Sequence, residues 1–232
     1  MPALCSRDSC RQTREPGNHI GQHSHRNTPQ LTWSPRKGRC FVELKQVKRE
    51  ILYTGRSFDL IVDEVEYPSG RRSVREIARH PGGAVIVPLF GDGNVMLIRQ
   101  LRYPLGRHIF ELPAGKLNVG EEPVVAAARE LEEETGWTAA RLEKLVSIYT
   151  TPGFCDEILH LFLATDLQES DHGNRREEGE FSMTTHRMPL QEAIGMISGG
   201  EIQDGKTIVG LLLTERLLRD GGIHLGTSGS SR

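Results

Sequence analysis

The hydrophobic positions along the chain predict strands in its first half and helices towards its end. Apolar side chains nearly alternate with polar ones from Phe58 to Tyr67, and the turn residues 68–70 separate this stretch from residues 73–78. This pattern predicts an antiparallel hairpin. Four more strands are expected, at 84–90, 95–100, 145–150 and 160–164, and the turn 91–94 separates the first two.

Three helices are expected, at about 122–135, 189–198 and 204–219. Pro123 suits the first turn of a helix, where its missing N–H costs nothing, and Gly136 marks the end of that helix. Asp204 stands where it can cap the last one. Strands and helices are mixed without a regular β-α-β order. The sequence therefore predicts an α/β fold in which helices cover a mixed sheet.

The composition divides the chain into four parts. Residues 1–39 lack hydrophobic periodicity and are rich in Arg, Ser, Pro, Asn and His, so we interpret them as a disordered leader. Residues 40–80 form an N-terminal β region, residues 81–219 form the main domain, and residues 220–232 form a flexible tail. The leader has seven basic and two acidic residues, a net charge of +5. Contact of this leader with RNA or a partner stays an alternative.

Composition and charge argue against several classes of protein. Of the 232 residues 37% are hydrophobic, and no apolar stretch approaches the ~20 residues that span a bilayer. The formal net charge of −2 gives no general attraction to nucleic acid. The four cysteines lack the spacing of a zinc site, so reduced thiols in a cytoplasmic protein are the simpler interpretation.

The candidate chemistry lies on the first predicted helix. A helical wheel places three glutamates on one face, with an apolar set opposite that is expected to pack on the sheet. The acidic set is Glu130, Glu133 and Glu134, and the apolar set is Val124, Ala128, Leu131 and Thr135. A solvated acidic face is the ordinary interpretation. However, like charges at this spacing destabilise a helix unless something neutralises them. Grouped carboxylate oxygens suit Mg²⁺ or Mn²⁺, which usually bind phosphate oxygens as well.

The same segment resembles the signature of a known family. The spacing Gly-x5-Glu-x7-Arg-Glu-(apolar)-x-Glu-Glu-x-Gly-(apolar) runs from Gly115 to Trp137 and is similar to the Nudix box of the Nudix hydrolases. Trp137 is bulkier than the usual aliphatic residue at its position. The resemblance implies an α/β/α sandwich with a mixed sheet, and hydrolysis of a nucleoside diphosphate linked to another group.

The resemblance also implies roles for individual residues. Glu130, Glu133 and Glu134 would bind Mg²⁺ or Mn²⁺ together with the Ala114 carbonyl, and Glu133 and Glu134 are assigned to catalysis as well. Supporting roles fall to Gly115, Glu121 and Arg129, of which the last two would orient the ligand carboxylates.

Segments outside the box resemble the ADP-ribose pyrophosphatase branch. They are His80–Ala84, Arg99–Pro104, Glu111–Gly115 and Thr151–Phe154. Arg102, Glu111 and Pro152 are therefore expected to bind substrate, and the Arg102 guanidinium suits two pyrophosphate oxygens. Leu101 stands where an aromatic residue is frequent in this branch.

A catalytic base is expected on a loop late in the chain. In the resembling enzymes a glutamate on a mobile loop serves as base or extra metal ligand, and here Glu178 and Glu180 are the candidates, with a solvated charge run as the rival interpretation. An aromatic side chain should stack on the base of the nucleotide, but the sequence does not choose among Tyr53, Phe58 and Tyr103. The resemblance further implies a homodimer in which the hairpin near residues 56–79 helps to build the partner's site.

These observations favour metal-dependent hydrolysis of ADP-ribose to AMP and ribose 5-phosphate. Three alternatives stay open at this point. They are a pyrophosphatase for another nucleotide sugar such as GDP-mannose or ADP-glucose, a sensor that binds a nucleotide sugar without cleaving it, and an RNA-directed hydrolase that uses the basic leader. A sensor would be expected to have lost metal-ligand glutamates, and this chain retains all of them.

Overall fold

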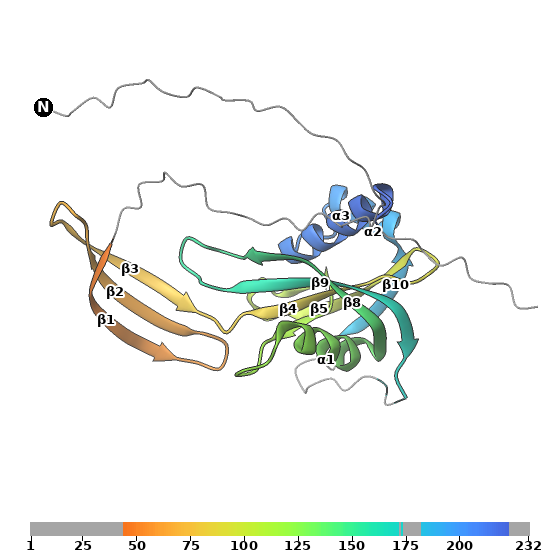
Figure 1. Ribbon diagram of the computed structural model, residues 1–232, viewed down its shortest axis with the longest axis horizontal. Helices are drawn as coiled ribbons and strands as arrows, with labels where there is room; N and C mark the ends of the chain where they lie inside the picture. The colour runs from red at the N-terminus through yellow and green to blue at the C-terminus, as the bar shows by residue number, and fades with distance from the viewer. Residues whose placement is uncertain (1–43, 172, 174–181, 223–232) are drawn as a thin grey trace, which may run out of the picture. The chain divides into compact units, whose positions relative to one another are not determined.

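The computed structural model describes residues 44–171, 173 and 182–222 of the chain (Figure 1). Three antiparallel strands come first: β1 (Lys45–Thr54), β2 (Asp59–Glu66) and β3 (Arg72–Arg79). Two further sheets follow. One contains β10 (Thr184–Pro189), β5 (Asn94–Arg102) and β6 (Arg107–Glu111); the other contains β7 (Ala114–Lys116), β4 (Gly83–Pro88), β9 (Ile158–Glu169) and β8 (Trp137–Tyr149). A short 3₁₀ helix, Tyr103–Leu105, connects β5 to β6.

Helices cover both faces of the four-stranded sheet. The sheet is mixed, because β4 runs parallel to β9 whereas its other pairs are antiparallel. Helix α1 (Pro123–Thr135) lies on one face, and α2 (Leu190–Ser198) and α3 (Gly205–Arg219) lie on the other (Figure 1). This arrangement confirms the predicted α/β/α sandwich with a mixed sheet.

Alternation along β4 separates the two hydrophobic cores. Ala84 and Ile86 face α1, where Leu131 is fully buried against them. Val85 and Val87 face the opposite core, which contains Leu211 of α3. All six residues of β4 are buried, as expected for a strand with helices on both sides.

Most elements predicted from the pattern are present. The hairpin of β2 and β3, the three helices, the Gly136 stop and the Asp204 cap are confirmed; Gly136 has φ 75°, and the Asp204 side chain accepts the Thr207 N–H. Strands β4 and β5 enter different sheets, although the turn between them suggests a hairpin. Their ends are joined by the Leu89–Val95 bridge and by the hydrogen bond from the Phe90 N–H to the Asn94 carbonyl. Strands β1, β6 and β7 were not predicted. All ten residues of β1 are exposed. Its sequence therefore lacks the alternation of apolar and polar residues that predicts a strand with one buried face.

The helical-wheel prediction for α1 is partly right: Leu131 and Thr135 are buried, but the other two members of the predicted apolar set are not. Val124 is 43% exposed and Ala128 is also exposed, whereas Glu130 and Glu134 are only 8% and 2% exposed. The buried stripe centres on the two glutamates because small residues, Ala126 and Ala127, let the helix approach the sheet there. The carboxylates therefore lie inside the packing face.

Trp137, the bulky residue at the end of the box, has a packing role. Its ring meets Phe90 edge to face, with centroids 4.9 Å apart. The guanidinium of Arg187 lies 3.8 Å from the centre of the Phe90 ring and binds Asp92 at 2.6 Å. This stack joins the end of α1 to the turn after β4 and to β10.

Several predictions concern residues outside the described ones. These are the leader 1–39, nearly all of the tail 220–232, and the candidate bases Glu178 and Glu180. Within the described part of the chain, no helix is long and apolar enough to cross a membrane.

Replacing Leu131 with alanine should lower the free energy of unfolding by about 2–5 kcal/mol, because it opens a cavity between α1 and the sheet. Val124→Ala on the same helix is the matched control and should change stability by less than about 0.5 kcal/mol. Urea denaturation of both variants checks this. Equal losses would contradict the observed orientation of α1.

Candidate active site

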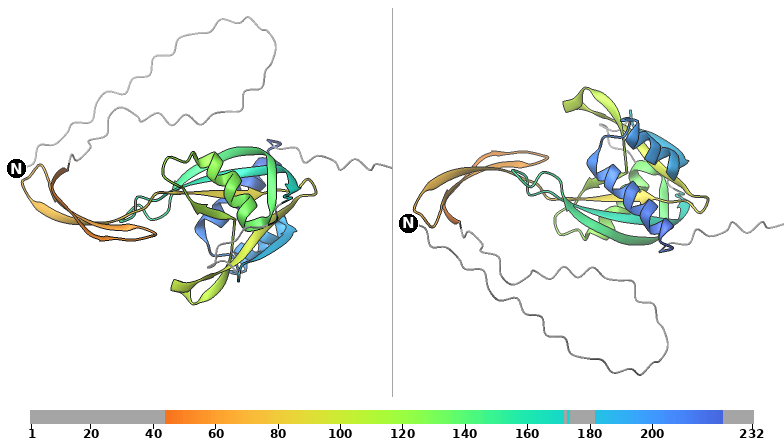
Figure 2. Two further views of the ribbon diagram at one scale, coloured as in Figure 1. Left: turned by 90° about the horizontal axis from the view of Figure 1, so that it is seen from below. Right: turned by 90° about the horizontal axis from the view of Figure 1, so that it is seen from above.

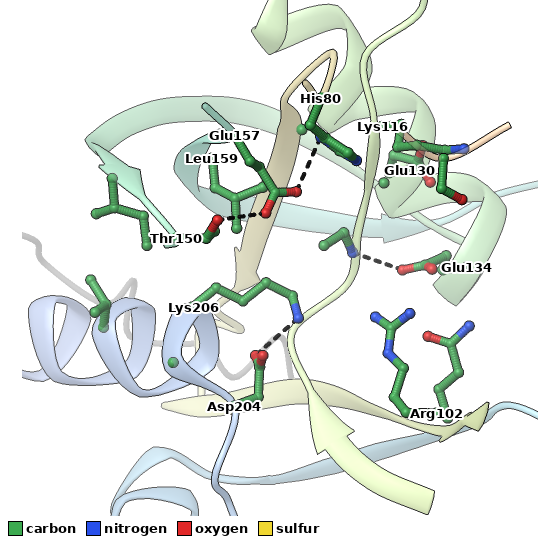
Figure 3. Close-up of a pocket in the computed structure, with 18 of the residues that line it drawn as sticks. His80, Arg102, Lys116, Glu130, Glu134, Thr150, Glu157, Leu159, Asp204 and Lys206 are labelled. Carbon is green, nitrogen blue, oxygen red and sulfur yellow. Dashed lines mark hydrogen bonds and ion pairs between the residues drawn. The ribbon is translucent and has the colours of Figure 1, made fainter. Parts of the chain in front are cut away.

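A cavity of about 1020 Å³ opens between α1, the start of α3 and the ends of several strands. Its volume suits a ligand of the size of a small cofactor or nucleotide. Acidic side chains from α1 and basic side chains from other elements line the same space (Figure 3). The lining includes Glu130, Glu133, Glu134, Arg129, Arg102, Lys116, Lys206, Glu157 and Asp204.

Arg129 holds the glutamates of α1 in place. Its Nε and Nη2 donate to the Glu121 carboxylate at 2.9 and 3.0 Å, and its Nη1 donates to Glu130 at 2.6 Å and to Glu133 at 3.0 Å. Nη2 also binds the Lys116 carbonyl at 3.1 Å. One guanidinium thus links the helix to the loop before it.

This cluster shifts the pKa of its members in the expected directions. The Arg129 hydrogen bonds, with help from the Asn118 N–H, lower the pKa of Glu121 from 4.5 to about 2. Glu121 in turn raises the pKa of Arg129, and contacts with Glu130 and Glu133 add to that effect. Glu121 and Arg129 therefore both stay charged at neutral pH.

Gly115 allows the Glu130 carboxylate to lie close to the backbone of β7. A Cβ at this position would lie 1.8 Å from Glu130 Oε1 and 2.0 Å from its carboxyl carbon. Any side chain here would displace the carboxylate. Glycine is therefore required by close approach.

Glu134 binds the loop that precedes β7. Its Oε2 accepts the Ala114 N–H at 2.9 Å, as Figure 3 shows. With 2% exposure, this carboxylate is nearly enclosed between α1 and the sheet. The contact places the Glu134 carboxylate beside residue 114, whose carbonyl was predicted as a metal ligand.

The oxygen donors fit a hard divalent cation, but they face other partners in this structure. Glu130 and Glu133 bind Arg129, and Glu134 binds the Ala114 N–H. Among the described residues, no three carboxylate, imidazole or thiol groups converge on one point as a ready metal site. A cation bound here would share Glu130 and Glu133 with Arg129 or displace it, because a carboxylate can accept more than one bond.

A second charged group forms the opposite part of the lining. The Glu111 side chain, 1% exposed, accepts hydrogen bonds from Arg102 Nε at 2.5 Å and Nη2 at 2.6 Å, and it also binds the Lys206 ammonium. Burial alone would raise the pKa of Glu111, but the bonds from Arg102 and the charge of Lys206 outweigh it and lower the pKa. Glu111 in turn raises the pKa of Arg102.

The first turn of α3 carries Lys206 into this group. Lys206 also pairs with Asp204 at 3.0 Å, and Asp204 caps the helix by accepting the Thr207 N–H at 3.0 Å. The Thr207 hydroxyl accepts the Leu112 N–H at 2.8 Å. The loop from Glu111 to Ala114 is therefore held by α3 at one end and by α1 at the other.

A third part of the lining is polar and more open. His80 Nδ1 lies 3.2 Å from Glu157 Oε1, and the Thr150 hydroxyl donates to Glu157 Oε2 at 2.7 Å (Figure 3). Tyr149, 63% exposed, lies beside them. Ser57 of the turn between β1 and β2 lines the same cavity, and Lys116 Nζ binds the Arg56 carbonyl at 3.2 Å.

The structure brings most of the predicted residues together but leaves three of the described ones, Glu111, Glu121 and Pro152, outside the lining. Ala114, Gly115, Arg102, Arg129 and the three glutamates all line the cavity, and Glu121 lies directly behind Arg129. Glu111 does not line it, because Arg102 and Lys206 cover its carboxylate. Pro152 is exposed and lies outside the lining.

The sequence prediction missed Lys206, Glu157, His80 and Lys116. For Lys206 a signal was available. A lysine two residues after a helix cap lies at the positive end of the helix dipole, which is unfavourable unless carboxylates pair with it. His80 begins a segment that resembles the ADP-ribose pyrophosphatase branch, but its contact with Glu157, 77 positions away, forms only in the fold and could not be predicted from the sequence.

Glu121→Gln should lower the free energy of unfolding at pH 7 by roughly 1–3 kcal/mol, because Arg129 loses its charged partner in a largely enclosed cluster. The folded pKa of Glu121 is depressed. Its contribution to stability is therefore present in full above about pH 4.5 and is lost as the pH falls towards 2. Denaturation curves of wild type and variant from pH 8 to 3 check this, with the exposed Glu143→Gln as control. A difference that disappears above pH 5 would contradict it.

Comparisons with known proteins agree with this site. The NUDIX domain pattern matches residues 79–209. The chain is 42% identical over 166 residues to an ADP-ribose pyrophosphatase of Bacillus subtilis, covering 72% of this chain and 89% of that protein. It is 39% identical over 171 residues to an ADP-ribose pyrophosphatase of Mycobacterium tuberculosis, covering 73% and 82%.

A solved structure shows the same fold. The crystal structure of an ADP compounds hydrolase superposes with a TM-score of 0.69 at 22% identity, over 80% of this chain and 99% of that one. The family match covers more than half of the chain, including the acidic helix, the Glu111–Ala114 loop and most of the cavity lining. The chain belongs to the NUDIX family of hydrolases.

Proposed function

We propose that this protein hydrolyses the pyrophosphate bond of ADP-ribose, giving AMP and ribose 5-phosphate. One observation carries the proposal: a single cavity has the α1 carboxylates on one side and the cations Arg102 and Lys206 on another. A pyrophosphate with its metal needs both, since carboxylates hold the cation and basic groups hold phosphate oxygens. The two ADP-ribose pyrophosphatases similar to this chain favour ADP-ribose as the substrate.

Mg²⁺ or Mn²⁺ is the proposed cofactor. Glu130, Glu133 and Glu134, with the Ala114 carbonyl, would hold it, and all of these are hard oxygen donors lining the cavity. When bound, the cation would polarise phosphoryl oxygens and lower the pKa of a water molecule. Arg129 would release Glu130 and Glu133 while keeping its two bonds to Glu121.

The chain's own residues would orient the substrate. Arg102 is proposed to contact the pyrophosphate, because two of its N–H donors are fixed on Glu111 while its side chain is 41% exposed in the cavity. Glu111 would then act from behind Arg102, as a positioning residue. Gly115 would keep space for the Glu130 carboxylate. Pro152 is proposed to shape the loop before Glu157.

Glu178 and Glu180 stay the candidates for the catalytic base. The described residues that flank them lead into β10, which pairs with β5, the strand that ends at Arg102. A general base must come within hydrogen-bond reach of the attacking water.

Glu134→Gln should reduce turnover of ADP-ribose by about 100-fold or more, since it removes a ligand charge while leaving an oxygen to accept the Ala114 N–H. The control is Glu132→Gln on the same helix, because the Glu132 carboxylate accepts the Ser170 hydroxyl outside the cavity. This variant should leave turnover unchanged. The measurement, with Mg²⁺, is release of the nucleoside monophosphate from each member of a panel: AMP from ADP-ribose and ADP-glucose, and GMP from GDP-mannose.

Each outcome of this panel has a meaning. Preference for ADP-ribose supports the proposal. Preference for another nucleotide sugar would keep the reaction and replace the substrate. Binding without cleavage of any member would favour a sensor, and an unaltered rate in Glu134→Gln would remove that residue from the site.

We also propose a homodimer in the cytoplasm, built through the sheet of β1, β2 and β3. Large apolar side chains of this sheet are exposed in the single chain, among them Ile51, Leu52, Tyr53 and Val74, each more than half exposed. Such a patch is typical of a protein–protein interface. A second copy of the chain would cover it.

Light scattering after gel filtration should give twice the mass of one chain. Ile51→Asp should shift the protein towards the monomer, because it places an unpaired charge in the proposed interface. Lys144→Met, on β8, is the control and should stay dimeric. A wild-type protein that elutes as a monomer at all concentrations would contradict the dimer.

A further inference from the structure

Lys206 is the charged residue of the cavity whose placement most needs an explanation. Its side chain is only 11% exposed and stands in the first turn of α3, where the helix dipole disfavours a cation. Two carboxylates compensate for this, Glu111 from β6 and Asp204 from the cap of the same helix. The first of these contacts joins positions 95 residues apart.

Glu111 is shared between two cations. Arg102 holds both carboxylate oxygens, and Lys206 binds one of them as well. Without Lys206, Arg102 alone would face the carboxylates of Glu111 and Asp204, and the group would have one net negative charge. With Lys206 present, two positive and two negative charges balance across Arg102, Lys206, Glu111 and Asp204.

The position of the Lys206 ammonium is fixed by neighbouring bonds. Asp204 accepts the Thr207 N–H and hydroxyl at 3.0 and 2.6 Å, and the Thr207 hydroxyl in turn accepts the Leu112 N–H. The first turn of α3 therefore contacts residues 111 and 112 through two adjacent side chains, Lys206 and Thr207. Lys206 meets Glu111 as part of a rigid contact between α3 and β6.

We propose that Lys206 is a positioning residue that acts on the substrate through Glu111 and Arg102. By neutralising the buried Glu111, it keeps the Arg102 guanidinium oriented and leaves its positive charge available to the pyrophosphate. This inference rests on the proposed function, and it adds a residue to the recognition of the pyrophosphate. Removing Lys206 would leave the group with one net negative charge beside the site for an anionic substrate. In a poorly solvated cavity that charge weakens anion binding.

The test is a charge-compensation cycle with Lys206→Met, Glu111→Gln and the double variant. Lys206→Met should raise KM for ADP-ribose about tenfold and leave kcat within about threefold. The reason is that the bound substrate and the transition state would lose the same amount of binding energy. The double variant should recover most of the loss, since the neutral amide that Glu111→Gln introduces needs no second cation. Lys206→Arg, which keeps the charge, should have a KM near that of wild type. Lys144→Met, which replaces an exposed lysine outside the cavity, is the control for net charge and should not change KM.

Three results would overturn the proposal. An unchanged KM in Lys206→Met would remove the residue from recognition, and a fall in kcat at constant KM would assign it another role. A double variant as weak as Lys206→Met would mean that Lys206 contacts the substrate directly. Circular dichroism and thermal melting identify a variant that fails to fold. If Lys206→Met fails to fold, the KM values of Lys206→Arg and of the double variant decide.

Calorimetric titration with inorganic pyrophosphate and Mg²⁺ separates this proposal from the proposed function. If wild type does not hydrolyse ADP-ribose, the proposed function fails, and the same cycle is then measured in pyrophosphate affinity. Weaker binding by Lys206→Met with recovery in the double variant would support the positioning role. Equal affinity in all variants would overturn it.

Discussion

The site depends on placing two carboxylates in the packing face of a helix. Glu130 and Glu134 lie between α1 and the sheet, where an uncompensated charge would be costly. Three features make this arrangement stable: the Arg129 guanidinium on Glu130, the Ala114 N–H on Glu134, and the absence of a side chain at Gly115. Two of these partners come from the loop and strand before the helix. The burial of these two carboxylates therefore depends on β7 as well as on α1.

The loop Glu111–Ala114 connects the two charged halves of the cavity. At its far end Glu134 of α1 binds Ala114, and at its near end Lys206 and Thr207 of α3 bind Glu111 and Leu112. Because α1 and α3 cover opposite faces of the same sheet, the loop passes between two rigid elements (Figure 2). This explains how the acidic side chains of α1 and the group of Arg102, Glu111 and Lys206 are held in different parts of one cavity.

Local sequence patterns predicted the positions of the helices and most strands, but they predicted only in part which side chains of α1 are buried. The helix limits, the Gly136 stop and the Asp204 cap depend on neighbouring residues, so the sequence contains them. The orientation of α1 does not follow from hydrophobicity, because Arg129 and a backbone N–H make the glutamates the buried residues while Val124 stays exposed. The spacing of the box identified the acidic cluster. The spacing of the box could not predict the contact of Lys206 with Glu111, 95 residues away, or the contact of His80 with Glu157.

The central claim is that the α1 carboxylates hold a divalent cation once Arg129 gives them up. Crystals grown with Mn²⁺ and examined by anomalous scattering test it most directly. The account predicts an anomalous peak for Mn²⁺ beside the Ala114 carbonyl and the carboxylates of Glu130, Glu133 and Glu134, with Arg129 retained on Glu121 but withdrawn from Glu130 and Glu133. A cavity without Mn²⁺, or Mn²⁺ bound elsewhere while Arg129 still bridges Glu121 and Glu130, would contradict it.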